Sequence, residues 1–352
     1  MKELLVRLTG IYGPSGREEA VRQAIRQEIE GFVDEITEDV MGNLIAVKKS
    51  SNPDAKKVML AAHMDQIGLI VTNIDENGFL RFSNVGGVSP FNVLHRRVVF
   101  QNGVTGAVSY ETELDDMNKL KLDKMYIDVG ARSREEAGKH VQIGDAAVYH
   151  APMAQSGDRY FGCAMDDRAG CAVLVETIRS VKESPNELIF VFTVQEEVGL
   201  RGAKTSAYTI NPDIGISVDV TLPGDTPKSR PMAVNLGDGP AVKVKDASVI
   251  CHPKVKDLMI QRAEEAGIPY QLEVLEYGGT DSGAIHLSRE GVPSGVISIP
   301  CRFSYLKRIP SRLLQIQLKP FRLKSVFSGA RNPARFLNLR QTRFKVPSIL
   351  RS

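Results

Sequence analysis

Apolar residues near the start of the chain recur with the period of a helix. Val21 and Ile25 lie four positions apart and would share one face of a helix over residues 15–30. Ser15 and Glu18 have the spacing of a capping box, in which the two side chains satisfy backbone amides of the first turn. The pattern therefore predicts an amphipathic helix that begins at Ser15.

Between residues 70 and 155 the apolar runs become shorter and alternate with Gly and Asn. Turn signals such as Asn77-Gly78 separate them, which is the pattern of β-hairpins. Residues 133–137 interrupt this segment with a helical pattern. We expect residues 70–155 to form a small inserted β-rich domain.

On either side of this insert, apolar runs of strand length alternate with helical patterns. Such alternation predicts an α/β fold with a mostly parallel sheet that helices cover on both faces. We expect one discontinuous α/β domain made of residues 1–69 and 156–302. The predicted strands are 43–48, 57–65, 188–194, 214–220, 271–275 and 295–299, and the further predicted helices are 167–182, 199–207 and 252–266.

The composition is that of an ordinary globular protein, with 352 residues of which 42% are hydrophobic and 25% charged. No run approaches the ~20 apolar residues that span a membrane, so we expect no membrane partner. The first residues lack the apolar length of a signal peptide. The four cysteines show no close-pair motif, and reduced core cysteines favour a cytoplasmic location.

The charge is distributed unevenly. Of the 45 Lys and Arg residues, 13 lie after residue 300, together with none of the 42 Asp and Glu residues, so the first 300 residues are acidic. A basic block can be a nucleic-acid arm. A diverged terminus and a shifted reading frame near residue 303 are the alternatives. We favour the frame shift, and expect residues 303–352 to be an aberrant basic tail without a native fold and without a nucleic-acid partner.

Acidic or imidazole side chains stand at the ends of several predicted strands or the start of a predicted helix. The set is His63, Asp65, Asp166, Asp167, Glu196, Glu197 and Asp219. Sites in α/β sheets form at the carboxyl ends of the strands, so these side chains should lie together. Neighbouring carboxylates repel one another unless a cation intervenes, and imidazole and carboxylate groups are ligands of zinc.

Each residue of this set also has an ordinary structural interpretation. His63 can be a buried histidine paired with Asp65. The Asp166-Asp167 pair can lie in a solvated loop, and the two glutamates can open an exposed helix. Asp219 can be a helix N-cap. A shared divalent-metal site explains the whole set with one assumption, and carboxylate-bridged metal pairs occur in aminopeptidases.

Taken together, the motifs resemble those of the di-metal glutamyl aminopeptidase/cellulase family, the tetrahedral dodecameric aminopeptidases. The resemblance covers residues 1–302, in order and with familiar spacing. It implies an α/β domain like that of zinc exopeptidases with an inserted β domain for subunit contact. The motifs are His63-Met64-Asp65, Asp166-Asp167-Arg168-Ala169-Gly170, Gln195-Glu196-Glu197-Val198-Gly199-Leu200-Arg201-Gly202-Ala203, Ser217-Val218-Asp219 and Gly278-Gly279-Thr280-Asp281-Ser282-Gly283.

The resemblance implies two divalent metal ions per subunit, zinc or cobalt. His63 and Asp219 would bind the first metal. Asp166 would bridge both metals, with a cis peptide bond to Asp167, and Glu197 would bind the second metal.

The resemblance also implies the chemistry. Glu196 would be the general base and acid, and Asp65 would orient His63. The reaction implied is removal of N-terminal residues from peptide substrates through a metal-bridged water. The partners implied are further copies of the chain, in a homo-oligomer of twelve subunits.

The chain departs from the family where the last metal ligand should stand. Family members carry a histidine just after the final strand, in the stretch that begins here at Cys301, but no histidine follows His286. The final acidic helix of the family is also absent. As written, the second metal keeps only Asp166 and Glu197 as protein ligands, and we expect weaker binding there.

Three functions therefore compete. The first is a metal-dependent aminopeptidase, which we favour. The second is a catalytically impaired relative that acts as a binding or assembly subunit, because one metal ligand is missing. The third is a glycoside hydrolase, suggested only by names used in the family, which would need two carboxylates and no metal pair.

Overall fold

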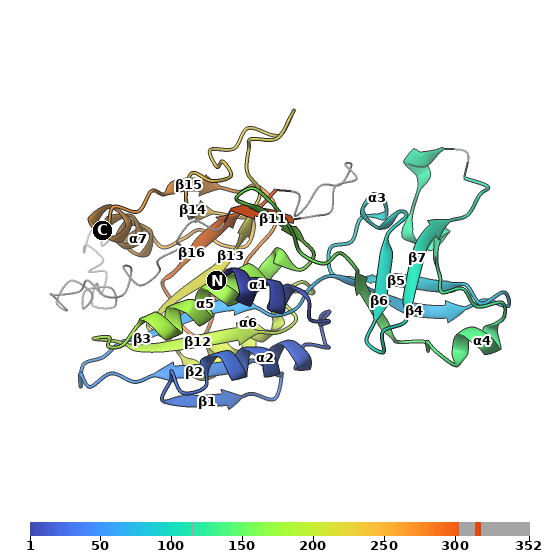
Figure 1. The fold of residues 1–352 in the computed structure, drawn as a ribbon. Coiled ribbons are helices and arrows are strands. Elements are labelled where there is room, and N and C mark those ends of the chain that lie inside the picture. Colours follow the sequence, from blue (N-terminus) through green and yellow to red (C-terminus); the bar gives the residue numbers. More distant parts are fainter. Residues whose placement is uncertain (115, 303–313, 318–352) are drawn as a thin grey trace, which may run out of the picture.

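The computed structural model describes residues 1–114, 116–302 and 314–317. It contains a large mixed sheet between two layers of helices, and a closed β-barrel that projects to one side of it (Figure 1). The predicted fold class is confirmed: an α/β sheet flanked by helices, with a small β-rich insert.

The central sheet has eight strands, and its middle strands run parallel to one another, with antiparallel neighbours on either side. Parallel pairing brings the carboxyl ends of the middle strands to one edge. The spatial order is β1 (Glu35–Glu38), β2 (Leu44–Lys48), β12 (Glu187–Thr193), β3 (Lys57–His63), β13 (Ile214–Thr221), β16 (Ser294–Pro300), β14 (Ala241–Lys245) and β15 (Gln271–Val274).

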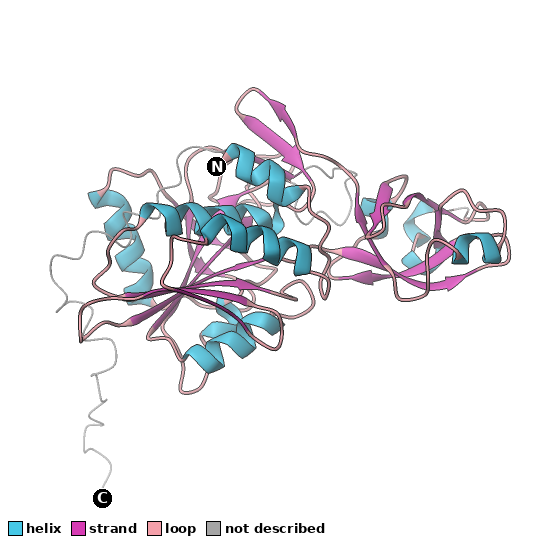
Figure 2. Ribbon diagram, turned by 60° about the horizontal axis from the view of Figure 1, so that its bottom comes forward, coloured by secondary structure: helices cyan, strands magenta, loops and turns pink. Residues whose placement is uncertain are grey.

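Helices pack on both faces of this sheet (Figure 2). Successive residues of β3 point to opposite faces, so Leu60 joins one apolar core and Met59 the other. The first core is covered by α1 (Lys2–Thr9), α2 (Glu19–Ile29), α5 (Met165–Ser180) and α7 (Pro253–Glu265), and the second by α6 (Arg201–Ile210) and α8 (Ser282–Ile285).

The barrel has an apolar core of its own. Its elements fall almost wholly within the segment for which we predicted a β-rich domain, although the domain boundaries themselves stay a prediction. The strands in order around the barrel are β4 (Gly68–Ile74), β5 (Leu80–Val85), β8 (Met125–Asp128), β7 (Thr105–Tyr110), β6 (Arg97–Phe100) and β9 (Ala146–Tyr149), and the short helices are α3 (Pro90–Val93), η1 (Met117–Lys119), η2 (Leu122–Lys124) and α4 (Arg134–Gly138).

A third, three-stranded sheet consists of β10 (Ala154–Ser156), β11 (Arg159–Gly162) and β17 (Leu314–Gln317). Four residues of the predicted basic tail thus pair with β11, and the remainder of residues 303–352 lies outside the described residues. All four cysteines are buried and none forms a disulfide. Within the described ranges, no helix is both long and apolar enough to cross a membrane.

The start of the first predicted helix is wrong. Helix α2 begins at Glu19, its N-cap residue is Glu18 rather than Ser15, and no side chain caps it with a hydrogen bond. The Ser15 hydroxyl instead donates to the Asp65 carboxylate at 2.6 Å, and Glu18 accepts from the backbone nitrogen of Gln195 at 3.1 Å. Tertiary partners therefore occupy the two side chains that would have formed the capping box.

Candidate metal centre

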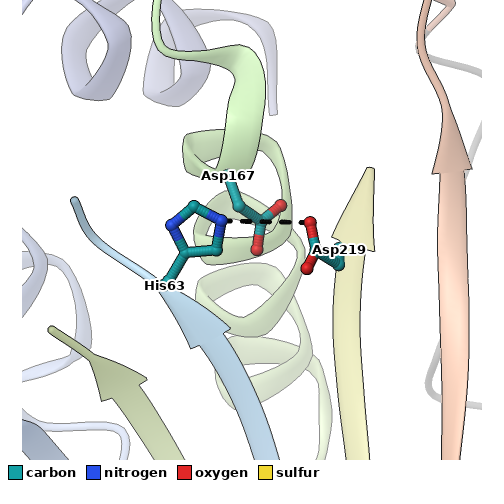
Figure 3. A group of neighbouring side chains, drawn as sticks. All are labelled: His63, Asp167 and Asp219. Carbon is teal, nitrogen blue, oxygen red and sulfur yellow. Dashed lines mark ion pairs between the residues drawn. The ribbon is translucent and has the colours of Figure 1, made fainter. Parts of the chain in front are cut away.

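The predicted site residues converge where β3, β12 and β13 end and α5 begins. Figure 3 shows His63, Asp167 and Asp219 pointing toward one another from β3, α5 and β13. Their ligand atoms lie within 4.8 Å of one another, and so do those of a second set formed by His63, Asp166 and Glu197. The two sets share His63, so one buried imidazole stands between two groups of carboxylates.

The imidazole of His63 is almost fully buried, at 2% exposure, and has two different polar neighbourhoods. Its Nδ1 lies 3.0 Å from the backbone carbonyl of Asp65, to which an N–H can donate. That bond leaves Nε2 directed at the carboxylates: 3.1 Å from Asp166, 3.8 Å from Glu196 and 3.9 Å from Asp219. A histidine fixed through one nitrogen in this way presents the other nitrogen to a metal.

The Asp166–Asp167 peptide bond is cis, as predicted. Both residues depart from helical backbone angles, and the regular helix starts after them. Asp167 Oδ1 accepts from the backbone nitrogen of Gly170 at 2.9 Å, as a helix cap does. Its other oxygen, Oδ2, is buried and has no hydrogen-bond partner among the described residues. A buried carboxylate oxygen of this kind needs a cation or a proton.

Asp65 lies behind His63 and contacts the turn that carries the two glutamates. Its Oδ1 accepts from the backbone nitrogen of Glu196 at 2.9 Å, and its Oδ2 accepts from that of Glu197 at 3.2 Å. Its carboxylate is 3.6 Å from His63 Nδ1, farther than its own carbonyl. Burial raises the pKa of Asp65, but the neighbouring His63, the Ser15 hydroxyl and the backbone amide of Glu196 outweigh burial, and the net pKa is lowered. The surroundings of Asp65 therefore favour its charged form although the side chain is buried.

The electrostatics of the cluster favour added positive charge. Burial, followed by mutual repulsion, raises the pKa of Asp167, Glu196, Glu197 and Asp219 well above the ordinary carboxyl value. Burial lowers the pKa of His63, but the charge of Glu196 and the hydrogen bond to Asp166 outweigh it, and the net pKa lies well above its usual value. Raised pKa values of this kind mean that the cluster favours added positive charge, which a bound cation would supply.

The donor set fits a divalent metal. It combines one imidazole nitrogen with several carboxylate oxygens, the ligand types that zinc and similar ions accept. The structure brings together all four residues predicted as metal ligands and places Glu196 and Asp65 beside them. In the described part of the chain, no further group of three His, Cys, Asp or Glu residues is placed to hold a metal. His286, the last histidine of the sequence, belongs to neither set, and its Nδ1 lies 2.9 Å from the carbonyl oxygen of Ser282.

Sequence reasoning missed several polar side chains that support this centre. Asp167 was expected only as the neighbour of Asp166. Asp281 is buried below the site, where it accepts from the Thr193 hydroxyl at 2.6 Å, and burial raises its pKa to about 6. Its position in the Gly278-Gly279-Thr280-Asp281 motif was the available signal. Glu18 and Asn43 carried no signal of a role at the site.

Comparison with known proteins finds aminopeptidases, the class of protein that the sequence motifs indicated. The family model for M42 glutamyl aminopeptidase matches residues 42–307. A protein of Acetivibrio thermocellus named "Putative aminopeptidase" is 59% identical over 303 residues, which cover 86% of this chain and 91% of that protein.

Solved structures agree with the sequence comparison. An aminopeptidase from the archaeon Desulfurococcus kamchatkensis superimposes with a TM-score of 0.85 at 38% identity, covering 90% of each chain. The TET1 peptidase of Pyrococcus horikoshii, which can assemble into a tetrahedron or a large octahedral shell, has a TM-score of 0.78 at 31% identity, covering 92% of this chain and 95% of its own.

Proposed function

The chain belongs to the M42 glutamyl aminopeptidase family and is a metal-dependent aminopeptidase, and from this premise we propose that two divalent metal ions, zinc or cobalt, bind at the cluster around His63. His63 and Asp219 would hold the first ion, Glu197 would hold the second, and Asp166 would contribute to both. Asp167 lies close enough to His63 and Asp219 to support the first ion.

The observation that carries this proposal is the convergence of buried and half-buried acids on one imidazole. Ligand atoms from three strand ends and one helix start lie within 4.8 Å of one another in two sets. Gathering several carboxylates at one partly buried point is costly in a protein interior. A divalent cation at this point would remove that cost for the whole set.

Metal ions bound here would supply Lewis-acid activation of the attacking water and of the scissile carbonyl. The chain itself supplies the proton transfer. Glu196 Oε2 lies 3.8 Å from His63 Nε2, next to the ligands but outside both metal-binding sets. From there Glu196 accepts a proton from the attacking water and delivers it to the leaving amine.

The substrates are peptides with a free N-terminus. We further propose that the chain works as a homo-oligomer. It is 31% identical to, and has the same fold as, a peptidase that can assemble into a tetrahedron or a large octahedral shell. The barrel, with a core separate from that of the sheet, is the part we expect to make subunit contacts.

The test is hydrolysis of amino-acid anilides by the full chain, with and without a chelator. We expect the chelator to abolish hydrolysis, and added Co²⁺ or Zn²⁺ to restore it. Hydrolysis that persists in the chelated protein, at the rate of the untreated protein, would contradict the proposal.

A further inference from the structure

The turn that carries Glu196 and Glu197 is held by side chains from three distant segments. Four successive backbone amides, those of residues 194–197, each donate to a side-chain oxygen. The contacts are Val194 N to Asn43 Oδ1 at 3.0 Å, Gln195 N to Glu18 Oε1 at 3.1 Å, Glu196 N to Asp65 Oδ1 at 2.9 Å and Glu197 N to Asp65 Oδ2 at 3.2 Å.

The amides of residues 194–197 need side-chain acceptors because these residues lie beyond the end of β12. Strand β12 ends at Thr193, so its ladder no longer pairs the following amides. Gln195 has a φ of +54°, which a non-glycine residue seldom adopts. Buried backbone N–H groups without partners are costly, and a backbone in this region persists only when its surroundings hold it.

Glu18 reaches the turn from the segment that precedes α2. Its Oε1 also accepts from the backbone nitrogen of Gly16 at 2.8 Å, and its side chain is 4% exposed. The buried guanidinium of Arg168 holds this segment through the carbonyls of Ile11 and Gly13, at 3.2 and 3.3 Å. Glu18 thus offers its oxygen from an anchored position.

Asn43 bonds to both ends of the segment 194–202, which leads from β12 into α6. Its Oδ1 accepts from Val194, and its Nδ2 donates to the carbonyl of Gly202 in α6 at 3.1 Å. Gly202 packs so closely that an added Cβ would lie 2.2 Å from Asn43 Oδ1. The side chain is fully buried, and its Nδ2 also donates to Asp39 at 2.6 Å.

We propose that Glu18 and Asn43 are positioning residues that hold Glu196 and Glu197 in their working places through the backbone amides of the turn. This proposal rests on the proposed function, because it assigns the turn to proton transfer and metal binding. Within the turn of residues 194–197, the two side chains accept hydrogen bonds from the backbone amides of residues 194 and 195.

The experiment compares Glu18→Ala, Glu18→Gln and Asn43→Ala with a control, Asp75→Ala. Asp75 Oδ1 likewise accepts two backbone amides, those of Asn77 at 3.0 Å and Phe79 at 2.9 Å, but in a turn of the barrel. Three quantities are measured on each folded full-length chain: hydrogen exchange of the peptide covering residues 194–200, Co²⁺ affinity by calorimetry, and kcat with KM.

We expect Glu18→Ala and Asn43→Ala to speed exchange of that peptide, and to lower Co²⁺ affinity or kcat by about 10- to 100-fold, as loss of supporting contacts does at metal sites. Glu18→Gln keeps an acceptor oxygen and should recover most of both losses. Asp75→Ala should change exchange only in the barrel.

Unchanged exchange at residues 194–200 in folded Glu18→Ala and Asn43→Ala would overturn the proposal. The proposal would also be overturned if Asp75→Ala lost as much Co²⁺ affinity as Glu18→Ala and Asn43→Ala do. Hydrogen exchange is measured without metal or substrate, so its result does not depend on whether the proposed function is correct. If the unaltered chain neither binds Co²⁺ nor hydrolyses anilides, the proposed function fails, while the exchange data still decide the role of Glu18 and Asn43.

Discussion

The carboxylate of Asp65 accepts a hydrogen bond from the backbone nitrogen of Glu196 at 2.9 Å. The same carboxylate accepts from Glu197 N at 3.2 Å and from the Ser15 hydroxyl at 2.6 Å, whereas His63 Nδ1 lies 3.6 Å away. The Asp65 side chain therefore binds the turn of the proposed base and ligand more closely than it binds the imidazole.

Replacing Asp65 with Asn should disturb the metal centre through that turn. An amide offers one acceptor oxygen where two backbone amides and a hydroxyl now donate, and its NH₂ group would face another donor. We expect Co²⁺ affinity or kcat to fall by about 10- to 100-fold. Ser15→Ala is the control, because it removes one donor and leaves both amide contacts. Calorimetry on the two variants checks this, and equal effects would contradict it.

Glu196 and Glu197 should have different roles, which substitution of each can distinguish. Glu196→Gln removes the proposed proton acceptor and should lower kcat by about 10²- to 10⁴-fold while metal affinity stays unchanged. Glu197→Gln removes a proposed ligand and should weaken binding of one metal ion. Each variant is the control for the other, with kcat and Co²⁺ titration measured on both. A loss of metal affinity in Glu196→Gln with full affinity in Glu197→Gln would reverse the assignment.

Most strands of the sheet could be predicted because their burial is visible in the sequence. Strands β3, β12 and β13 are apolar runs, and their observed ends fall within two residues of the predicted ones. Strand β14 was missed since Lys243 interrupts its apolar pattern. That lysine is fully buried beside Glu273 at 3.0 Å, so an ion pair replaces the apolar side chain that would have marked the strand.

The site was predictable in part for a similar reason. Acidic or imidazole side chains at the ends of several apolar runs are unusual enough to indicate a shared cation. His63 and Asp219 could therefore be found by their positions in the sequence. Glu18 and Asn43 could not, because their partners are backbone amides more than 150 positions away. In the sequence, Glu18 has the spacing of a helix cap, and only the tertiary contact shows its other role.

Stability should depend on pH through Glu18. Burial raises its pKa from the ordinary value of 4.5 to about 7. An acid whose pKa is higher in the folded state contributes stability below its unfolded pKa, and loses that contribution as pH rises through the folded pKa. The free energy of unfolding of the unaltered chain, relative to Glu18→Gln, should therefore fall between about pH 4.5 and pH 7, by about 3 kcal/mol at most, and change little above pH 7.

Denaturant unfolding of the two chains across this pH range checks the prediction. Taking the difference between them cancels the titration of all other groups that the substitution leaves alone. A difference that stays constant, or grows, as pH rises would show that Glu18 is ionised throughout the range.

The account depends on divalent ions binding where His63, Asp166, Glu197 and Asp219 meet. Calorimetric titration of the chelator-treated full chain with Co²⁺, beside His63→Ala and Asp219→Asn, measures this directly. We predict saturable binding of two ions, the second weaker because no histidine follows His286, and loss of the tighter step in both variants. Absence of saturable binding in the unaltered chain, or unchanged binding in the two variants, would contradict the account.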